Sequence, residues 1–481
     1  MFGARSSRHI KHNLLWKFAK RVLLTAVFGG LGLTSLTASA AAADKLTIQD
    51  SFELPDWFQL KAEVRGRVQH LDNQFRPALP ETDTIFALRS LVDMRFRVSK
   101  DLFFGFELQD SRLVGADEAT AVSTGIINTF NLLQAYVRYS TDDVMGIEGR
   151  HQISAGRMTM QLGRGRLIGR QGFRNAVGAF TGVHYEWDTD DTSLDAFWLL
   201  PIDRLPNDRA ALLENDSQFD RESLAQQLWA IHLERRDLPF GLLGQVYLFG
   251  IHERDQPDRN TRNRQLYTPG FTVFKPAAPG EWFVDLEMSF NIGRSRVTSS
   301  VLETEDLDHF AYTAHAEVGY RFTAPWSPLL ILQFDFASGD ADPTDGKNGQ
   351  YDTLFGPKRG DFGDTDIYGA LARENIIAPA VAVRLFPTDT IAARVRYQPA
   401  WLEEARDGWP DIGVRDITGQ SGRFIGHQIE TRFTWDVANG NIRLGAGADV
   451  LFKGRFARAA PNANPATGDT LYLYSDVTLR F

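Results

Sequence analysis

Apolar and polar side chains alternate with a period of two along most of this 481-residue chain. The final segment is typical: Leu473, Val477 and Phe481 fall on one face, and Asp476 and Arg480 fall on the other. This period is that of a β-strand, and helical spacing does not fit it. Many barrels of bacterial outer membranes end on an aromatic residue in such a strand, so each alternating segment is interpreted as apolar toward lipid and polar toward a lumen.

Segments with the same alternation recur, and many are long enough to cross a membrane as tilted strands. They include 57–69, 86–98, 102–108, 133–139, 282–290, 312–322, 330–336, 429–435 and 442–452. Asn439-Gly440 separates the last two and indicates a tight hairpin, because both central residues of such a turn need positive φ. These segments predict an all-β protein.

The connections between the segments alternate in length. Short turns are expected at about 99–101, 141–146, 189–192, 236–241, 276–280, 323–328, 387–390 and 437–441. Long polar links are expected at about 70–84, 110–129, 158–178, 201–225, 254–269, 293–309, 338–379, 399–425 and 453–470. Eight short and nine long links give seventeen connections and hence eighteen strands. The pattern predicts a transmembrane antiparallel β-barrel of about 18 strands with short periplasmic turns and long extracellular loops; a soluble β-sandwich or propeller is the alternative.

The first 43 residues predict a cleaved signal peptide. Six basic residues (Arg5, Arg8, Lys11, Lys17, Lys20 and Arg21) precede an apolar run, and small residues then offer cleavage after Ala40 or Ala43. An uncleaved membrane anchor is the alternative interpretation. The remaining residues, 44–481, are expected to form a single barrel domain in the bacterial outer membrane, in contact with lipid and lipopolysaccharide.

Charge argues against nucleic acid as a partner. The chain carries a net charge of -9, and removal of a leader with six basic and no acidic residues leaves -9 - 6 = -15. The chain has no cysteine, so no disulfide framework supports it, and a large ladder of backbone hydrogen bonds must do so.

Basic residues predominate on the polar faces of the expected strands. They are Lys61, Arg65, Arg67, Arg89, Arg95, Arg97, Arg138, Arg321, Arg384, Arg394, Arg396, Arg432 and Arg443. Fewer acids fall there, so the excess negative charge is expected in loops such as 340–345, 361–366 and 403–407. A lumen rich in arginine attracts anions, and the guanidinium fork suits carboxylates. The alternative is that these arginines only pair with neighbouring acids along the wall.

Two long links carry distinctive strings. The segment 156–170 holds four arginines and four glycines, followed by Arg174-Asn175; it suits a loop that folds inward as a constriction, or a surface loop on lipopolysaccharide phosphates. The segment 335–356 holds Asp340, Asp342 and Asp345, whose spacing misses the calcium loop of an EF-hand, so solvated turns are expected before calcium.

These two strings resemble those of the alginate export family of porins. The first matches as Gly-Arg, Gly-x-x-Arg-Leu-Ile-Gly and Arg-Asn, and the second as Ser-Gly-Asp, Pro-x-Asp-Gly-Lys and Leu-Phe, in the same order and spacing. The resemblance implies a monomeric eighteen-stranded barrel with an arginine-rich constriction, and its founding members export polyuronate. It also implies that Arg157, Arg166 and Arg174 are pore residues.

The chemistry of an enzyme is not apparent in the sequence. It has no zinc-type His/Cys cluster, P-loop or nucleophile elbow, and His151, His184 and His232, far apart in sequence, are expected to be ordinary wall residues. No cofactor is expected. The sequence predicts a channel for an anionic polysaccharide such as alginate or oligouronate. A general uptake porin for small anions, organic acids or sugars is the alternative, and a barrel that only anchors enzymatic or adhesive loops is a third hypothesis. Whether a periplasmic partner docks on the short turns stays open.

Overall fold

The computed structural model describes residues 45–481 apart from 119, 258, 358 and 467. The expected signal peptide lies outside the described residues. Residues Lys45–Phe481 form one compact unit. Among the described residues no helix is long and apolar enough to cross a membrane.

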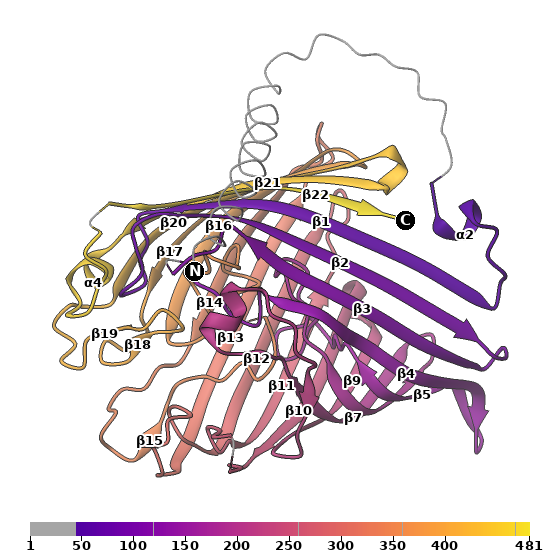
Figure 1. Ribbon diagram of the computed structural model, residues 1–481, viewed down its shortest axis with the longest axis horizontal. Helices are drawn as coiled ribbons and strands as arrows, with labels where there is room; N and C mark the ends of the chain where they lie inside the picture. The colour runs from indigo at the N-terminus through magenta and orange to yellow at the C-terminus, as the bar shows by residue number, and fades with distance from the viewer. Residues whose placement is uncertain (1–44, 119, 258, 358, 467) are drawn as a thin grey trace, which may run out of the picture. The chain divides into compact units, whose positions relative to one another are not determined.

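The unit is a closed antiparallel barrel, and the prediction of eighteen strands is confirmed. The strands (Figure 1) are β1 Phe58–Asp72, β2 Asp83–Arg97, β3 Leu102–Val114, β4 Asn128–Val144, β5 Ile147–Met158, β6 Phe180–Asp188, β7 Thr192–Asp203, β9 Gln226–Leu238, β10 Leu242–Glu253, β11 Gln265–Lys275, β12 Trp282–Ser295, β13 Leu307–Arg321, β14 Leu329–Ala337, β16 Ile376–Thr388, β17 Ile391–Trp401, β20 Phe424–Val437, β21 Ile442–Lys453 and β22 Thr470–Arg480.

Short elements occupy the links. They are α2 Ile48–Ser51, α3 Arg209–Leu213, α4 Arg455–Ala459, the 3-10 turns η2 Pro239–Gly241 and η3 Ala438–Gly440, and the two-residue strands β8 Arg221–Glu222, β15 Lys347–Asn348, β18 Gly408–Trp409 and β19 Val414–Arg415. All eight short turns and nine long links fall where the alternation places them. In η3, Asn439 and Gly440 have φ of 55° and 86°, as the hairpin signal requires.

The two ends of the chain close the barrel. In Figure 1 β1 runs beside β22, and Val64 lies opposite Leu479 in their antiparallel register. The ladder continues through Phe481, whose backbone N–H donates to the carbonyl oxygen of Ala62 at 3.0 Å. Closure removes the free sheet edges that a membrane does not tolerate.

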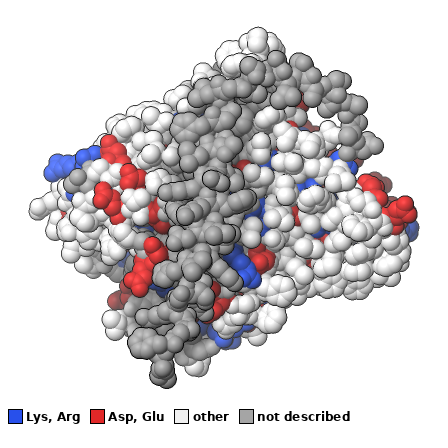
Figure 2. All heavy atoms as spheres, turned by 45° about the horizontal axis from the view of Figure 1, so that its top comes forward, with Lys and Arg blue, Asp and Glu red and all other residues white. Residues whose placement is uncertain are grey.

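Register keeps the two faces chemically distinct. Between β12 and β13 the outward pairs are apolar, for example Leu286 with Ala316, while Asp285 lies opposite Glu317 on the inward face. Leu332 on β14 is 60% exposed, which is the state of a side chain that faces lipid. On the face shown in Figure 2, acidic side chains stand at both the left and the right ends, and uncharged side chains cover much of the described surface on the right.

The main buried apolar cluster draws on both the strands and the long links. Ile168, Tyr368 and Trp409, from three different links, are almost fully buried. Phe75 of a fourth link stacks on Trp409 with ring centroids 5.3 Å apart. Apolar side chains of the links therefore pack against one another, which holds these links in place against the polar wall.

Candidate functional site

Two long links fold into the lumen and define its passage. We call residues 159–179 the arginine loop and residues 338–375 the long loop. The arginine loop crosses from β12 to β1: Arg166 donates to Glu287 of β12 at 2.8 Å, and Arg65 of β1 donates to the carbonyl oxygen of Gly172 at 2.8 Å. An isolated parallel bridge between Ile168 and Phe355 joins the two loops. The position of the arginine loop agrees with the inward constriction and not with a surface loop.

Arg166 is the main anchor of the arginine loop. Its buried guanidinium contacts Asp285 at 3.1 Å, Glu287 at 2.8 Å and Asp361 of the long loop at 2.9 Å. Burial works to lower the pKa of Arg166, but Asp361, Asp285 and Glu287 outweigh it and hold that pKa well above its ordinary value. One side chain thus ties the wall and both loops together.

The long loop brings carboxylates to arginines of the barrel wall. Asp364 pairs with Arg432 of β20, and Asp366 pairs with Arg67 of β1 at 3.1 Å. The prediction that loop 361–366 keeps its acids away from the lumen is therefore wrong. The loop turns inward because its own apolar residues pack inside the barrel and its acids complete ion pairs there.

Arg394 and Arg396 belong to this paired interior. Both contact Glu430, which is fully buried. For these two arginines the structure agrees with the alternative interpretation, in which they pair with acids along the wall.

A cavity of about 420 Å³ next to the arginine loop has a strongly basic lining. Its described lining includes two carboxylates, Glu63 and Asp476, and seven arginines: Arg65, Arg67, Arg89, Arg170, Arg432, Arg443 and Arg480. Phe173 of the arginine loop lies under the guanidinium of Arg67, 3.7 Å from ring centroid to Cζ. The aromatic ring and the loop carbonyls hold the arginine wall in a fixed arrangement.

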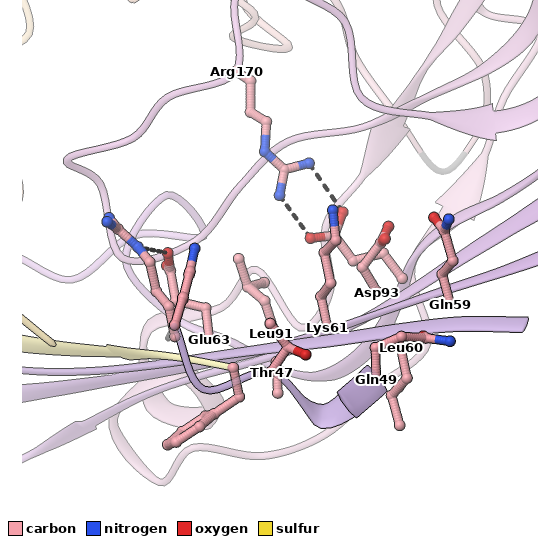
Figure 3. Close-up of a pocket in the computed structure, with 14 residues that line it drawn as sticks. Thr47, Gln49, Gln59, Leu60, Lys61, Glu63, Leu91, Asp93 and Arg170 are labelled. Atoms are coloured by element: carbon pink, nitrogen blue, oxygen red, sulfur yellow. Dashed lines mark hydrogen bonds and ion pairs between the residues drawn. The ribbon is translucent and has the colours of Figure 1, made fainter. Parts of the chain in front are cut away.

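Two further cavities adjoin this one and share Arg170 with it. Figure 3 shows the first of them: Arg170 reaches from its loop toward the wall that carries Lys61 and Asp93. Arg170 donates to both oxygens of Glu107, at 2.7 and 2.9 Å. The second, of about 520 Å³, lies along β1–β6 and includes Arg138. Together they form a continuous set of polar hollows beside the arginine loop.

The structure divides the predicted pore residues into four groups. Eight line these cavities: Lys61, Arg65, Arg67, Arg89, Arg95, Arg138, Arg432 and Arg443. Arg394 and Arg396 are in the buried network, and Arg166 and Arg174 are in the arginine loop. The fourth group lies outside the three cavities: Arg97 is exposed near the end of β2, and Arg157 stands on β5.

Arg157 does not join the other pore residues. It stands on the same face of β5 as Ile153, which is 47% exposed and points outward, and its guanidinium pairs with Glu222 of β8 at 2.6 Å. Strand alternation sends it away from the lumen. Arg174 instead faces other cations: burial first, then Arg359 and Arg204, lower its pKa to about 10.

The aspartates considered for calcium do not gather. Asp342 accepts hydrogen bonds from the N–H and Oγ1 of Thr344 at 3.1 and 2.7 Å, and Asp345 accepts one from the N–H of Lys347 at 2.9 Å. Asp340 receives no contact from either in the described part of the chain. These are aspartate turns of the expected kind.

Sequence reasoning missed several cavity residues. Arg170 and Phe173 stand in the arginine-rich run, and their position beside the matched motif was an available signal. Tyr474 lies on the polar face of β22 beside Asp476 and Arg480, whose direction toward the lumen the alternation predicted. Asp361, Asp364 and Asp366 gave no sign of turning inward, because strand periodicity carries no information about the path of a long loop.

Acidification is expected to release the arginine loop only at low pH. Burial works to raise the pKa of Asp361, but Arg166, His315 and Arg373 hold it well below its usual range. A carboxyl group whose pKa is lower in the folded protein stabilises the fold at pH values above its unfolded pKa of about 3.9. This stabilisation is lost as the pH falls through the pKa of the folded state. The high-conductance states that report release of the arginine loop should therefore appear only below about pH 4. Their appearance already at pH 6 would contradict this assignment.

The class of protein follows from the fold and the lumen: this is an outer-membrane β-barrel channel. The family model described as "Alginate export" matches residues 56–467, and the chain belongs to that family. No curated protein sequence matches it.

Several solved porins share the fold. Pseudomonas aeruginosa OccK9 (OpdG) is 12% identical, with 88% of this chain and 98% of that chain covered and a TM-score of 0.56. A BenF-like porin from Pseudomonas fluorescens is 10% identical, with coverage of 88% and 99% and a TM-score of 0.55. Pseudomonas aeruginosa OccK2 (OpdF), solved in complex with glucuronate, is 12% identical, with coverage of 88% and 97% and a TM-score of 0.53.

Proposed function

We propose that this channel passes an anionic saccharide, either a polyuronate such as alginate or its oligomers, across the outer membrane. The observation that carries the proposal is the cavity lined by seven arginines and two carboxylates. Such a lining raises the local concentration of anions, and low-dielectric walls strengthen the field. Many exchangeable guanidinium–carboxylate contacts let a chain slide, because no single contact retains it.

The interior pairing refines this proposal. Arg67 is buried against Asp366 of the long loop, and the buried Arg65 donates to backbone carbonyls, which carry no net charge. Arg170, Arg432, Arg443 and Arg480 each pair with at least one carboxylate but keep 31–40% of their side chains exposed. These four are therefore the cations that a permeating carboxylate reaches first.

Planar-bilayer recordings of the purified protein test the proposal. The reversal potential in a salt gradient should indicate anion selectivity, and added oligouronate should reduce the current in a dose-dependent manner, because the polymer occupies the arginine-lined cavity. A neutral oligosaccharide of equal length is the control. Cation selectivity without block by oligouronate would overturn the proposal.

The second candidate is a general uptake porin for small organic acids or sugars. The size of the individual hollows, about 420 and 520 Å³, favours it, since each could hold a single small solute. The OccK2 structure was solved in complex with glucuronate, a small organic acid, and supports the general porin by analogy of fold alone. Liposome swelling separates the two: rapid entry of neutral monosaccharides supports the general porin, and block by oligouronate but not by glucuronate supports the polymer channel.

The chain is also expected to act without a cofactor or a second subunit. We propose that it catalyses no reaction, works as a monomer and meets only lipid and lipopolysaccharide around its apolar face. The short turns are the surface on which a periplasmic partner would dock.

A further inference from the structure

Two histidines and two acids that are distant in sequence meet on the inner wall of β6, β7 and β9. His184 and Glu186 stand on the inward face of β6. Register places Asp195 of β7 opposite Glu186 on one side and opposite His232 of β9 on the other. The three strands therefore bring four potential metal ligands to one level of the wall, a gathering that the sequence by itself did not indicate.

Three of the four residues are close enough to hold one metal ion, and His232 approaches them through Asp195. His184 Nε2 lies 3.0 Å from Asp195 Oδ1, and His232 Nδ1 lies 3.5 Å from Asp195 Oδ2. Ligand atoms of His184, Glu186 and Asp195 all lie within 4.8 Å of one another. Two ligands of a tetrahedral zinc ion lie about 3.3 Å apart, given bonds of about 2.0–2.1 Å. Coordination by all four residues requires the His232 ring to turn toward the other three ligands.

His232 supplies an independent indication of a ligand. Its ring is 3% exposed, yet neither ring nitrogen has a hydrogen-bond partner among the described residues. Its Nδ1 points to Asp195 without the geometry of a hydrogen bond. Buried imidazole nitrogens are normally satisfied, and a bound cation would satisfy this one.

The group opens to the lumen through a cavity whose lining also carries Lys61, Arg95 and Arg170. His184 and Glu186 line the cavity of about 520 Å³ beside the arginine loop. Arg138 contacts Glu186 at 3.2 Å and compensates one of the two carboxylates, so the group keeps one negative charge when both histidines are neutral. Mixed nitrogen and oxygen ligands favour zinc or a similar transition-metal ion, whereas magnesium and calcium prefer oxygen alone.

We propose that His184, Asp195 and His232, with Glu186 as the fourth ligand, form a binding site for a divalent transition-metal ion such as Zn²⁺ on the lumen wall. The site is separate from the arginine-lined cavity and does not depend on which anion the channel carries. The ion would crosslink β6, β7 and β9 at the height of the arginine loop.

Titration of the chelator-stripped full-length barrel with Zn²⁺ tests the site by equilibrium dialysis. We expect one saturable site per chain that excess Mg²⁺ does not displace. The double variant His184→Asn/His232→Asn should weaken binding by more than about 100-fold, because loss of an outer-shell partner alone costs about 10–100-fold. Asp195→Asn, which keeps the shape of the side chain, should also weaken it.

His151→Asn is the matched control. His151 is a buried histidine on the adjacent strand β5 whose two ring nitrogens already contact Tyr185 Oη and the carbonyl oxygen of Ile147, so its loss should leave Zn²⁺ affinity unchanged. Heat-modifiable migration on gels verifies that each barrel is folded. Absence of a saturable site in the wild type, equal affinity in the double variant, or displacement by Mg²⁺ would each overturn the proposal.

Discussion

Replacement of Arg166 by methionine should detach the arginine loop from the barrel wall and increase conductance. The change leaves Asp285, Glu287 and Asp361 facing one another without their shared cation. Loss of one partner from a buried ion pair costs about 3–5 kcal/mol. A loss of about 3 kcal/mol raises the detached fraction of the loop by about 100-fold. Single-channel recordings should show frequent high-conductance states, and trypsin should cleave the loop at Arg164 or Arg170 in the folded barrel.

Arg157→Met is the control for this experiment. It removes an arginine at the foot of the same loop, but one that pairs only with the partly exposed Glu222, so both conductance and cleavage should stay as in the wild type. If Arg166→Met gives wild-type conductance and protection, Arg166 does not anchor the loop.

Charge removal inside the cavity should weaken anion selectivity. The triple variant Arg170→Gln/Arg443→Gln/Arg480→Gln removes three of the seven arginines from the lining and leaves the acids Glu63 and Asp476 in place. A unit charge at 4 Å contributes about 1 kcal/mol even in bulk water, which is about fivefold in local anion concentration. The reversal potential should therefore move from that of an anion-selective channel toward that of an unselective one, and block by oligouronate should weaken.

A second triple variant separates position from net charge. Arg235→Gln/Arg294→Gln/Arg458→Gln removes the same charge from side chains that are 47%, 66% and 47% exposed and that line none of the three adjoining cavities. Its selectivity should match that of the wild type. Equal loss of selectivity in both triple variants would show that overall charge, and not the cavity, sets ion preference.

Strand alternation predicted the barrel well because it reports a local property. Each side chain on a strand points either outward or inward, so the sequence alone predicts that Leu286 faces outward and Asp285 faces inward. The lengths of the links then give the order of strands, since neighbouring antiparallel strands need only a turn. For the same reason most inward basic residues, such as Arg65 and Arg89, were placed correctly on the wall.

The state of those residues was beyond sequence reasoning. Arg65 and Arg89 look alike in the pattern, but Arg65 donates to loop carbonyls whereas Arg89 also pairs with Glu63. Arg157 was predicted as a pore residue from a family motif. A motif does not specify whether a side chain at the end of a strand faces the lumen or the outside. His184 and His232 both contact Asp195 because β7 lies between β6 and β9 in the sheet. The sequence does not show this arrangement.

The sequence by itself determined that this chain closes into an eighteen-stranded membrane barrel, ending with Phe481 beside the first strand, because period-two patterning and link length are properties of short segments. The tertiary structure alone decided what fills the barrel. Two loops enter the lumen, where the carboxylates of the long loop pair with Arg67 and Arg432, while Arg170, Arg443 and Arg480 pair with acids of the strands. The loop pairs join residues 299 and 68 positions apart, and no local pattern encodes them.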